Sequence, residues 1–285
     1  MLSIVKLTFR EILSRRIFMI TLLMTLAFLV FYGVGNHYAA KGIVESLHGM
    51  QDSSIFRDAV STQLVNMGLN FSSMIVALLA ILATVGAISS DIESHQIDTM
   101  LARPLRRQSL VLGKFFGLSM LVILYALALF IGILLINRFI GGDVAAQIEF
   151  VDGMKATLLF ILSPLPIVAA ALWMSTRLTT INGGIVLIVM YGMGFVGGLI
   201  EQVGALLSNQ ALVNTGIISS LVFPFDALFR KMSAILLNTG GALPMMGSSS
   251  FASSAEPSNL MLVYAVVYTF GFLYFSIRHF TMRDV

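Results

Sequence analysis

The chain has 285 residues, of which 58% are apolar and 11% are charged. Soluble globular domains carry about 25% charged residues, so this composition excludes a soluble protein and predicts an integral membrane protein. The net charge of +3 does not indicate nucleic-acid binding, because excess Lys and Arg in membrane proteins normally mark cytoplasmic loops, and the absence of cysteine excludes disulfides and thiolate chemistry.

Residues 1–16 predict a helix that lies in the membrane interface. Lys6 and Arg10 lie away from its apolar stripe, which consists of Leu2, Val5, Phe9, Ile12 and Leu13. A first span follows at about 17–35. A cleaved signal peptide is the alternative for this run, but the run is longer than the roughly 7–15 apolar residues of a signal sequence. We therefore treat it as an uncleaved span.

Five more apolar runs of spanning length follow, each of about 20 residues. They predict helices at about 69–88, 115–136, 156–174, 181–200 and 259–277. With the first run, they predict an all-α integral membrane protein that has six transmembrane helices and forms a single domain over residues 1–285.

Two of these spans carry residues that shape a helix. In the fourth, Pro164 and Pro166 remove backbone donors, so we expect a kink. In the fifth, Gly194 and Gly198 form a face of small residues that lets helix backbones approach closely. That face serves either packing within the chain or contact between subunits.

The charges of the loops predict the orientation. With the N-terminus in the cytoplasm, most Lys and Arg residues fall in the inner segments and most Asp and Glu residues in the outer ones. Both termini are then cytoplasmic. No charged residue lies centrally in a predicted span, which disfavours an autonomous proton-driven antiporter.

Residues 89–114 form a long charged connection, SSDIESHQIDTMLARPLRRQSLVLGK, on the predicted cytoplasmic side. Asp91 to Ala102 can form a short helix whose acidic residues suit the dipole at its start. Pro104 ends this helix, and a second helix leads into the third span. The pattern predicts a rigid projection that is suited to receiving force from a partner.

Residues 201–258 are expected to be extracytoplasmic. Asp226 could cap a helix from Ala227 to Leu237. One hypothesis is that Pro224, Asp226 and Arg230 form an outer-leaflet gate or a docking surface for an extracytoplasmic partner. The alternative, which we prefer, is an interface helix that closes the fold.

Two segments carry a resemblance to a known family. The stretch from Asp91 to Gly117 resembles the loop after span two in ABC type-2 transporter permeases, where an acidic cluster precedes a Gly-Thr pair, a leucine-rich turn, a proline and a Gly-Lys pair. The matching positions here are Glu93, Leu101, Pro104, Gly113 and Lys114, with His95 and Gln96 in place of the Gly-Thr pair. Residues 223–230, FPFDALFR, are similar to a Pro-x-Asp-x-x-x-Arg segment in the branch that contains the permease of the nitrous-oxide-reductase maturation system.

The resemblance implies an exporter-type permease subunit in the cytoplasmic membrane. A second permease copy or a paralogue would pair with it, and cytoplasmic ATP-binding cassette subunits would bind beneath, with ATP and Mg²⁺ held there and no cofactor in this chain. The loop after span two would be the coupling helix. ATPase contacts are expected at Asp91, Glu93, His95, Gln96, Leu101, Arg103 and Pro104, with Gly113 and Lys114 anchoring the base of span three. The alternative is that these charges only solvate a loop.

Catalytic motifs are missing from the sequence. It contains no G-x-x-x-x-G-K-[ST] phosphate loop and no H-E-x-x-H motif, and its four histidines are scattered. We therefore expect no catalytic or metal-binding residue here and expect ATP hydrolysis in a separate subunit. The alternative function is a non-transporting membrane module that uses such an ATPase for signalling or for mechanical control of an extracytoplasmic partner. An intramembrane aspartyl protease is disfavoured, because the segment IGGDV at 140–144 offers one aspartate and no second Asp lies in a span to complete the catalytic dyad.

Overall fold

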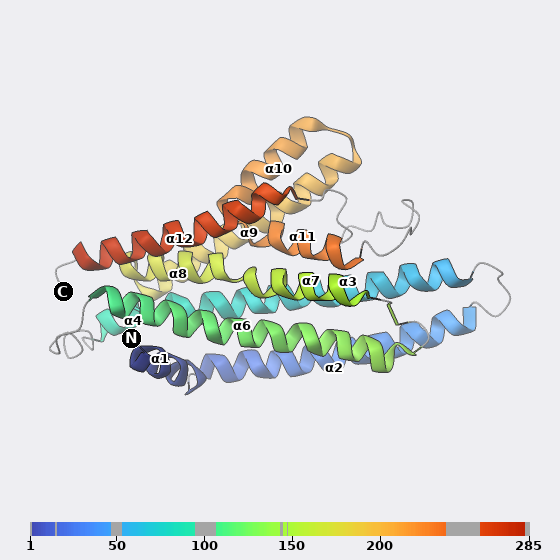
Figure 1. The fold of residues 1–285 in the computed structure, drawn as a ribbon, viewed down its shortest axis with the longest axis horizontal. Helices are drawn as coiled ribbons and strands as arrows, with labels where there is room; N and C mark the ends of the chain where they lie inside the picture. Colours follow the sequence, from blue (N-terminus) through green and yellow to red (C-terminus); the bar gives the residue numbers. More distant parts are fainter. Residues whose placement is uncertain are drawn as a thin grey trace.

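The computed structural model is a bundle of long helices (Figure 1). It describes residues 2–14, 16–46, 53–94, 107–142, 145–146, 148–237 and 257–282, and these contain no strand. Helix α1 (Leu2–Ser14), the short α4 (Ser89–Glu93) and the end of the last helix, α12 (Asn259–Met282), lie at one end of the bundle, which we call the α4 end. The all-α fold class is confirmed.

Six helical segments of the described chain are long and apolar enough to cross a membrane, as predicted. They are formed by α2 (Arg16–Ser46), α3 (Ser53–Val85) with α4, α6 (Arg107–Ile140), α7 (Phe150–Leu162) with α8 (Leu165–Arg177), α9 (Thr180–Leu206) and α12 (Asn259–Met282). The helices extend beyond the predicted spans because apolar runs mark only the part in lipid. The 33 residues of α3, for example, measure about 50 Å, against roughly 30 Å of hydrocarbon.

The N-terminal helix is amphipathic, as expected. Its apolar side packs on α6, where Thr8 and Ile12 are buried. A Cβ atom on Gly117 of α6 would lie only 3.1 Å from the carbonyl oxygen of Val5. Glycine at this position therefore allows α1 to cross close to the backbone of α6.

The expected proline kink divides the fourth span into α7 and α8. Pro164 cannot donate to the carbonyl of Phe160, four residues earlier. The hydroxyl of Ser163 donates to that carbonyl instead, at 2.8 Å. A neighbouring side chain thus satisfies the acceptor that the proline leaves open.

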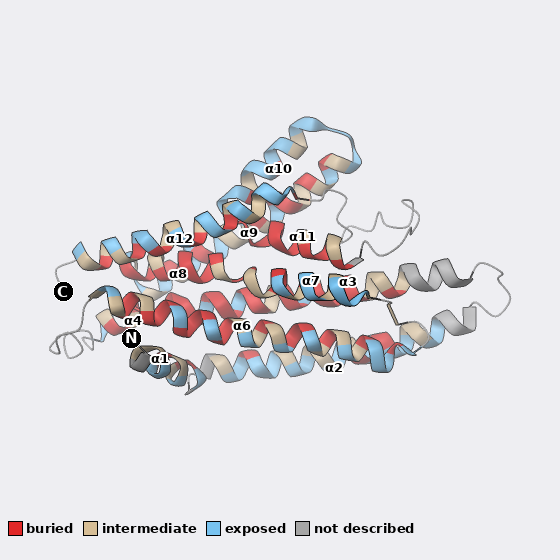
Figure 2. Ribbon diagram, in the orientation of Figure 1, coloured by how far each residue is buried: buried red, intermediate tan, exposed pale blue. Residues whose placement is uncertain are grey.

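The interior of the bundle is formed mainly by α3, α8 and a third helix, α11 (Phe225–Leu237), whereas α2, α9 and α12 expose much apolar surface (Figure 2). Among the fully buried side chains are Leu79, Ile81 and Leu172. Exposed apolar side chains are expected in a bilayer, because lipid tails are as apolar as they are.

The segment after α9 differs from the single amphipathic surface helix that the sequence predicts. Helix α10 (Gln210–Val222) folds back along α9, and the chain then bends by 113° into α11. Helix α11 packs against α7, α9, α3 and α12 and is buried over most of its length. The bent α10–α11 pair is apolar enough for a broken span or a re-entrant loop. Burial inside the bundle replaces the expected position at the interface.

Candidate functional site

A buried ion pair lies at the α4 end. Asp91 on α4 and Lys114 on α6 are 5% and 3% exposed. The Lys114 ammonium donates to Asp91 Oδ2 and to the carbonyl oxygen of Ala87. Buried charges are tolerated when they are paired and hydrogen-bonded. This pair therefore joins the end of α3 and its extension α4 to the start of α6, where Gly113 is also buried.

Glu93 makes a second connection, from α4 to α9. Its Oε1 accepts the backbone N–H of Thr180 at 2.9 Å. Thr180 is the first residue of α9, so the carboxylate lies at the positive end of that helix dipole. Glu93 thus occupies the position of a helix cap supplied from another segment.

Hydroxyl groups complete the network between α4, α8 and α9. Ser175 Oγ on α8 accepts the backbone N–H groups of Ile88 and Ser89, each at 2.9 Å. Ser89 Oγ lies 2.8 Å from Thr180 Oγ1. Ser175 and Thr180 are not among the predicted site residues, since isolated hydroxyl residues carry no distinctive pattern in a sequence.

These contacts hold the two ends of the connection between α4 and α6. Asp91 points inward at Lys114 and Glu93 points at α9, although sequence reasoning expected both as ATPase contacts. His95, Gln96, Leu101, Arg103 and Pro104 lie outside the described residues. The connection of twelve residues, 95–106, therefore begins and ends at helices that are tied to each other and to α8 and α9.

A glycine face on α9 receives α10 and α11. A Cβ atom on Gly194 would lie 2.9 Å from the carbonyl oxygen of Phe223, and one on Gly198 would collide with Asp226 Oδ2. On α10, a Cβ atom on Gly216 would lie 2.5 Å from the backbone nitrogen of Glu201. The spacing of Gly194 and Gly198 thus serves packing within the chain.

Three buried charged residues join α9 to α11 at this face. Arg230 Nη2 lies 2.7 Å from Glu201 Oε2, and Arg230 Nε lies 2.9 Å from Asp226 Oδ2. Their exposed fractions are 3% for Arg230, 7% for Glu201 and 9% for Asp226. The sequence suggested that Asp226 caps a helix from Ala227, but α11 begins at Phe225, so Asp226 lies inside the helix, where its carboxylate accepts from Arg230.

The triad of Glu201, Asp226 and Arg230 is buried, although all three residues belong to the segment 201–258 that was expected to be extracytoplasmic. Pro224, which stands at the bend before α11, is buried together with Asp226 and Arg230. These residues therefore face the interior of the chain instead of forming a docking surface. Glu201 is not among the predicted site residues, because the predicted fifth span ends at residue 200. The signal was its spacing of three residues from both Gly198 and Gly204, which places all three on one helix face.

The sequence profile of the ABC-2 family transporter proteins matches residues 2–285. The chain belongs to the ABC-2 family. No curated protein matches it at a significant level. As an ABC-2 transporter protein, it is a multi-pass membrane component of permease type.

Within this ABC-2 protein, the α4 end is a junction of four helices. The described residues contain no group of three or more His, Asp or Glu side chains placed to hold a metal ion. What the α4 end contains is a set of short polar contacts between α4 and α6, α8 and α9. Such contacts can pass a displacement from one helix to the next.

Proposed function

We propose that this protein is the permease subunit of an ABC transporter and that a separate ATPase subunit binds at the α4 end. The observation that carries the proposal is the fastening of α4, through Asp91 to α6 and through Glu93 to α9. A movement imposed on residues 95–106 would displace three spans together. ATP and Mg²⁺ would bind to the ATPase.

We infer that the α4 end faces the cytoplasm, as do both termini. Basic residues gather there, as the positive-inside rule requires: Lys6, Arg10, Arg107, Lys114, Arg177 and Arg278. The opposite end carries fewer basic residues in α6 and α7, Arg138 and Lys155, beside Glu149 and Asp152. This orientation places residues 95–106 where a cytoplasmic ATPase can reach them.

We further propose that the protein pairs with a second permease, identical or paralogous, and acts in export from the cytoplasm. The resemblance of residues 89–114 to the coupling loop supports both statements. Assignment to the branch of the nitrous-oxide-reductase maturation permease rests on the Pro-x-Asp-x-x-x-Arg segment. Its Asp226 and Arg230 form an ion pair here, which gives the spacing a structural reason.

Replacement of Glu93 tests the coupling role. Glu93→Lys puts a cation at the start of α9, where the helix dipole disfavours it, while Glu93→Gln keeps an acceptor for the Thr180 N–H. We expect the lysine variant to insert normally but to lose the ATPase subunit or most permease-dependent ATP hydrolysis, and the glutamine variant to retain more of both. The measurement is subunit retention and ATPase activity of the purified complex in proteoliposomes.

Asp152→Lys, at the opposite end, is the control for added charge. Unchanged ATPase retention and activity in Glu93→Lys would contradict the coupling role. Substrate-stimulated hydrolysis with uptake into inverted vesicles supports transport. Nucleotide-dependent binding of an extracytoplasmic protein without flux would support the non-transporting module instead.

A further inference from the structure

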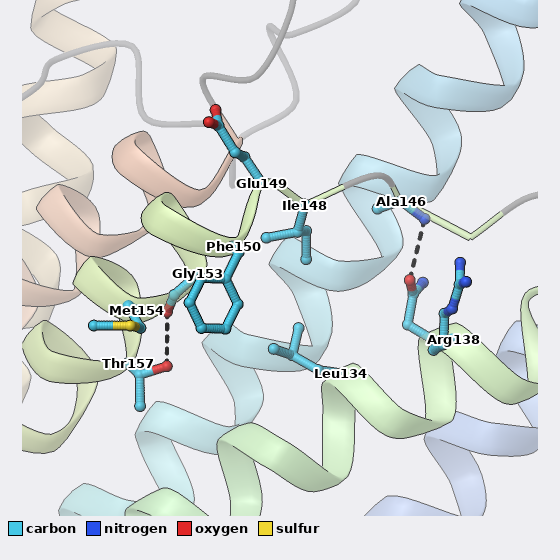
Figure 3. Close-up of a pocket in the computed structure, with 10 residues that line it drawn as sticks. Leu134, Arg138, Ala146, Ile148, Glu149, Phe150, Gly153, Met154 and Thr157 are labelled. Carbon is cyan, nitrogen blue, oxygen red and sulfur yellow. Dashed lines mark hydrogen bonds between the residues drawn. The ribbon is translucent and has the colours of Figure 1, made fainter.

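A cavity of about 970 Å³ lies between the end of α6 and the start of α7, at the end of the bundle opposite the α4 end (Figure 3). Its volume falls within the range of small-molecule sites, about 300–1,000 Å³. Leu134, Phe150 and Met154 supply apolar lining. None of the coupling contacts lies near it, so a ligand bound in this cavity is independent of the proposed function.

Four polar side chains line the cavity: Thr157 donates to the carbonyl oxygen of Gly153, and Asn137, Arg138 and Glu149 do not pair with one another. Asn137 is 3% exposed, and its Oδ1 accepts the backbone N–H of Ala146 at 3.1 Å. Its Nδ2 is buried and has no partner among the described residues. A buried donor without a partner is rare in proteins and calls for a ligand or solvent molecule. The hydrogen bond to Ala146 fixes the amide so that its donor side remains free.

The two charged residues of the cavity are also unpaired. Arg138 and Glu149 are exposed, and neither side chain makes an ion pair or hydrogen bond within the described part of the chain. Figure 3 shows their charged ends on different sides of the connection that contains Ala146 and Ile148. Arg138 and the Asn137 amide therefore offer donors on one side of this connection, and the Glu149 carboxylate extends from its other side. This arrangement complements a ligand that carries both signs of charge.

The depth of the cavity indicates the kind of ligand. Twenty-three residues, none of them charged, separate Lys114 from Arg138 on α6, which is a distance of about 36 Å. Since the hydrocarbon layer is about 30 Å thick, Arg138 lies at the level of the lipid headgroups and Leu134 lies about one turn deeper. Phe139 and Phe150 are 80% and 79% exposed there, as is expected of apolar side chains that contact lipid.

We propose that this cavity binds a phospholipid with an amine headgroup, of the phosphatidylethanolamine type, from the adjacent leaflet. The phosphate accepts hydrogen bonds from the Arg138 guanidinium and the Asn137 amide. The ammonium group lies towards Glu149. An acyl chain extends along Leu134 and Met154 towards the membrane centre.

Lipid retention by the purified full-length protein tests the proposal. Native mass spectrometry would compare phosphatidylethanolamine, phosphatidylglycerol and phosphatidylcholine added at equal concentration. We expect the wild-type protein to retain phosphatidylethanolamine preferentially. Arg138→Gln should weaken the retention of every phospholipid about fivefold, the effect of one basic group near a lipid phosphate.

Two further variants separate the headgroup contacts. Glu149→Gln should remove the preference for phosphatidylethanolamine over phosphatidylglycerol, because the carboxylate both attracts the ammonium and repels an anionic headgroup. Asn137→Asp keeps the acceptor for the Ala146 N–H but removes the free donors, so it should weaken phospholipid binding. Lys155→Gln and Asp152→Asn are matched controls, since this exposed pair lies on α7 outside the cavity lining.

Equal retention of the three lipids by the wild-type protein would overturn the proposal, because apolar packing of the acyl chains alone would then explain lipid binding. Loss of lipid in the two control variants to the same extent as in Arg138→Gln and Glu149→Gln would also overturn it. So would a second copy of the chain that covers the cavity, detected as a dimer whose lipid content does not respond to these substitutions.

Discussion

At the scale of single residues, each buried charged residue of the described chain has a partner of opposite charge. Lys114 has two acceptors, Asp91 and the Ala87 carbonyl, and Arg230 has two carboxylates. Removing one member of a buried pair leaves an uncompensated charge, which costs more than the pair itself contributes. Both sites should therefore be more sensitive to single than to paired replacements.

The Asp91–Lys114 pair allows this expectation to be measured. Lys114→Met leaves the Asp91 carboxylate buried and unpaired, so we expect a loss of about 3–5 kcal/mol of folding free energy. The double variant Asp91→Asn, Lys114→Met should recover a large part of this loss. Thermal unfolding of the purified protein in detergent gives the comparison.

Lys155→Met serves as the control at this scale. Its side chain is 59% exposed and pairs with Asp152 on the surface, and such pairs contribute about 1 kcal/mol or less. Equal melting temperatures for the single and the double variant at the α4 end would show that Lys114 does not neutralise Asp91.

At the scale of helices, the close approach of α9 and α10 depends on glycine. Gly216 faces the backbone of Glu201, whereas Gly192 on α9 has no neighbouring atom within 4 Å of an added Cβ. Two helix backbones can approach this closely only where a small residue lies at the contact. The α10–α11 pair is held by this packing and by the Arg230 contacts.

Alanine replacements distinguish the two glycines. Gly216→Ala forces α10 away from α9, and we expect it to destabilise the protein by about 1–3 kcal/mol, as overpacking does. Gly192→Ala should be neutral or slightly stabilising, because alanine favours helix and meets no atom. Melting temperatures of the two variants provide the test, and a larger loss in Gly192→Ala would contradict the packing.

At the scale of the whole molecule, the bundle has two different ends. The α4 end carries Lys6, Arg10, Arg107, Lys114, Arg177 and Arg278 and the tied connection. The other end carries the cavity between α6 and α7, together with Arg138 and Lys155. An ATPase can act on the protein only if the α4 end is cytoplasmic. The orientation of the chain is therefore a precondition of the proposed function.

The absence of cysteine allows this orientation to be measured with single cysteine variants. We expect Lys155→Cys to react with a membrane-impermeant maleimide in intact cells, because Lys155 is exposed at the outer end. Arg278→Cys, near the end of α12, should react only after permeabilisation. The unmodified chain is the blank, and the reverse labelling pattern would exclude an ATPase at the α4 end in the cytoplasm.

The sequence alone determined the helical class, the six spans and the break at Pro164. These features follow from the length of an apolar run and from the missing backbone donor of proline, and both are local properties. The helix ends were less well predicted, since Asn36, His37 and Lys41 of α2 remain helical beyond the apolar run.

Only the tertiary structure decided which charged residues meet. Asp91 turns to Lys114, Glu93 reaches Thr180, and Glu201 becomes part of a buried triad because helices far apart in the chain pack together. The burial of α11 has the same cause: the amphipathic pattern of 225–237 is compatible with an interface helix, and the bend of 113° directs it into the bundle. Partners and burial depend on helix packing, which a one-dimensional pattern does not specify.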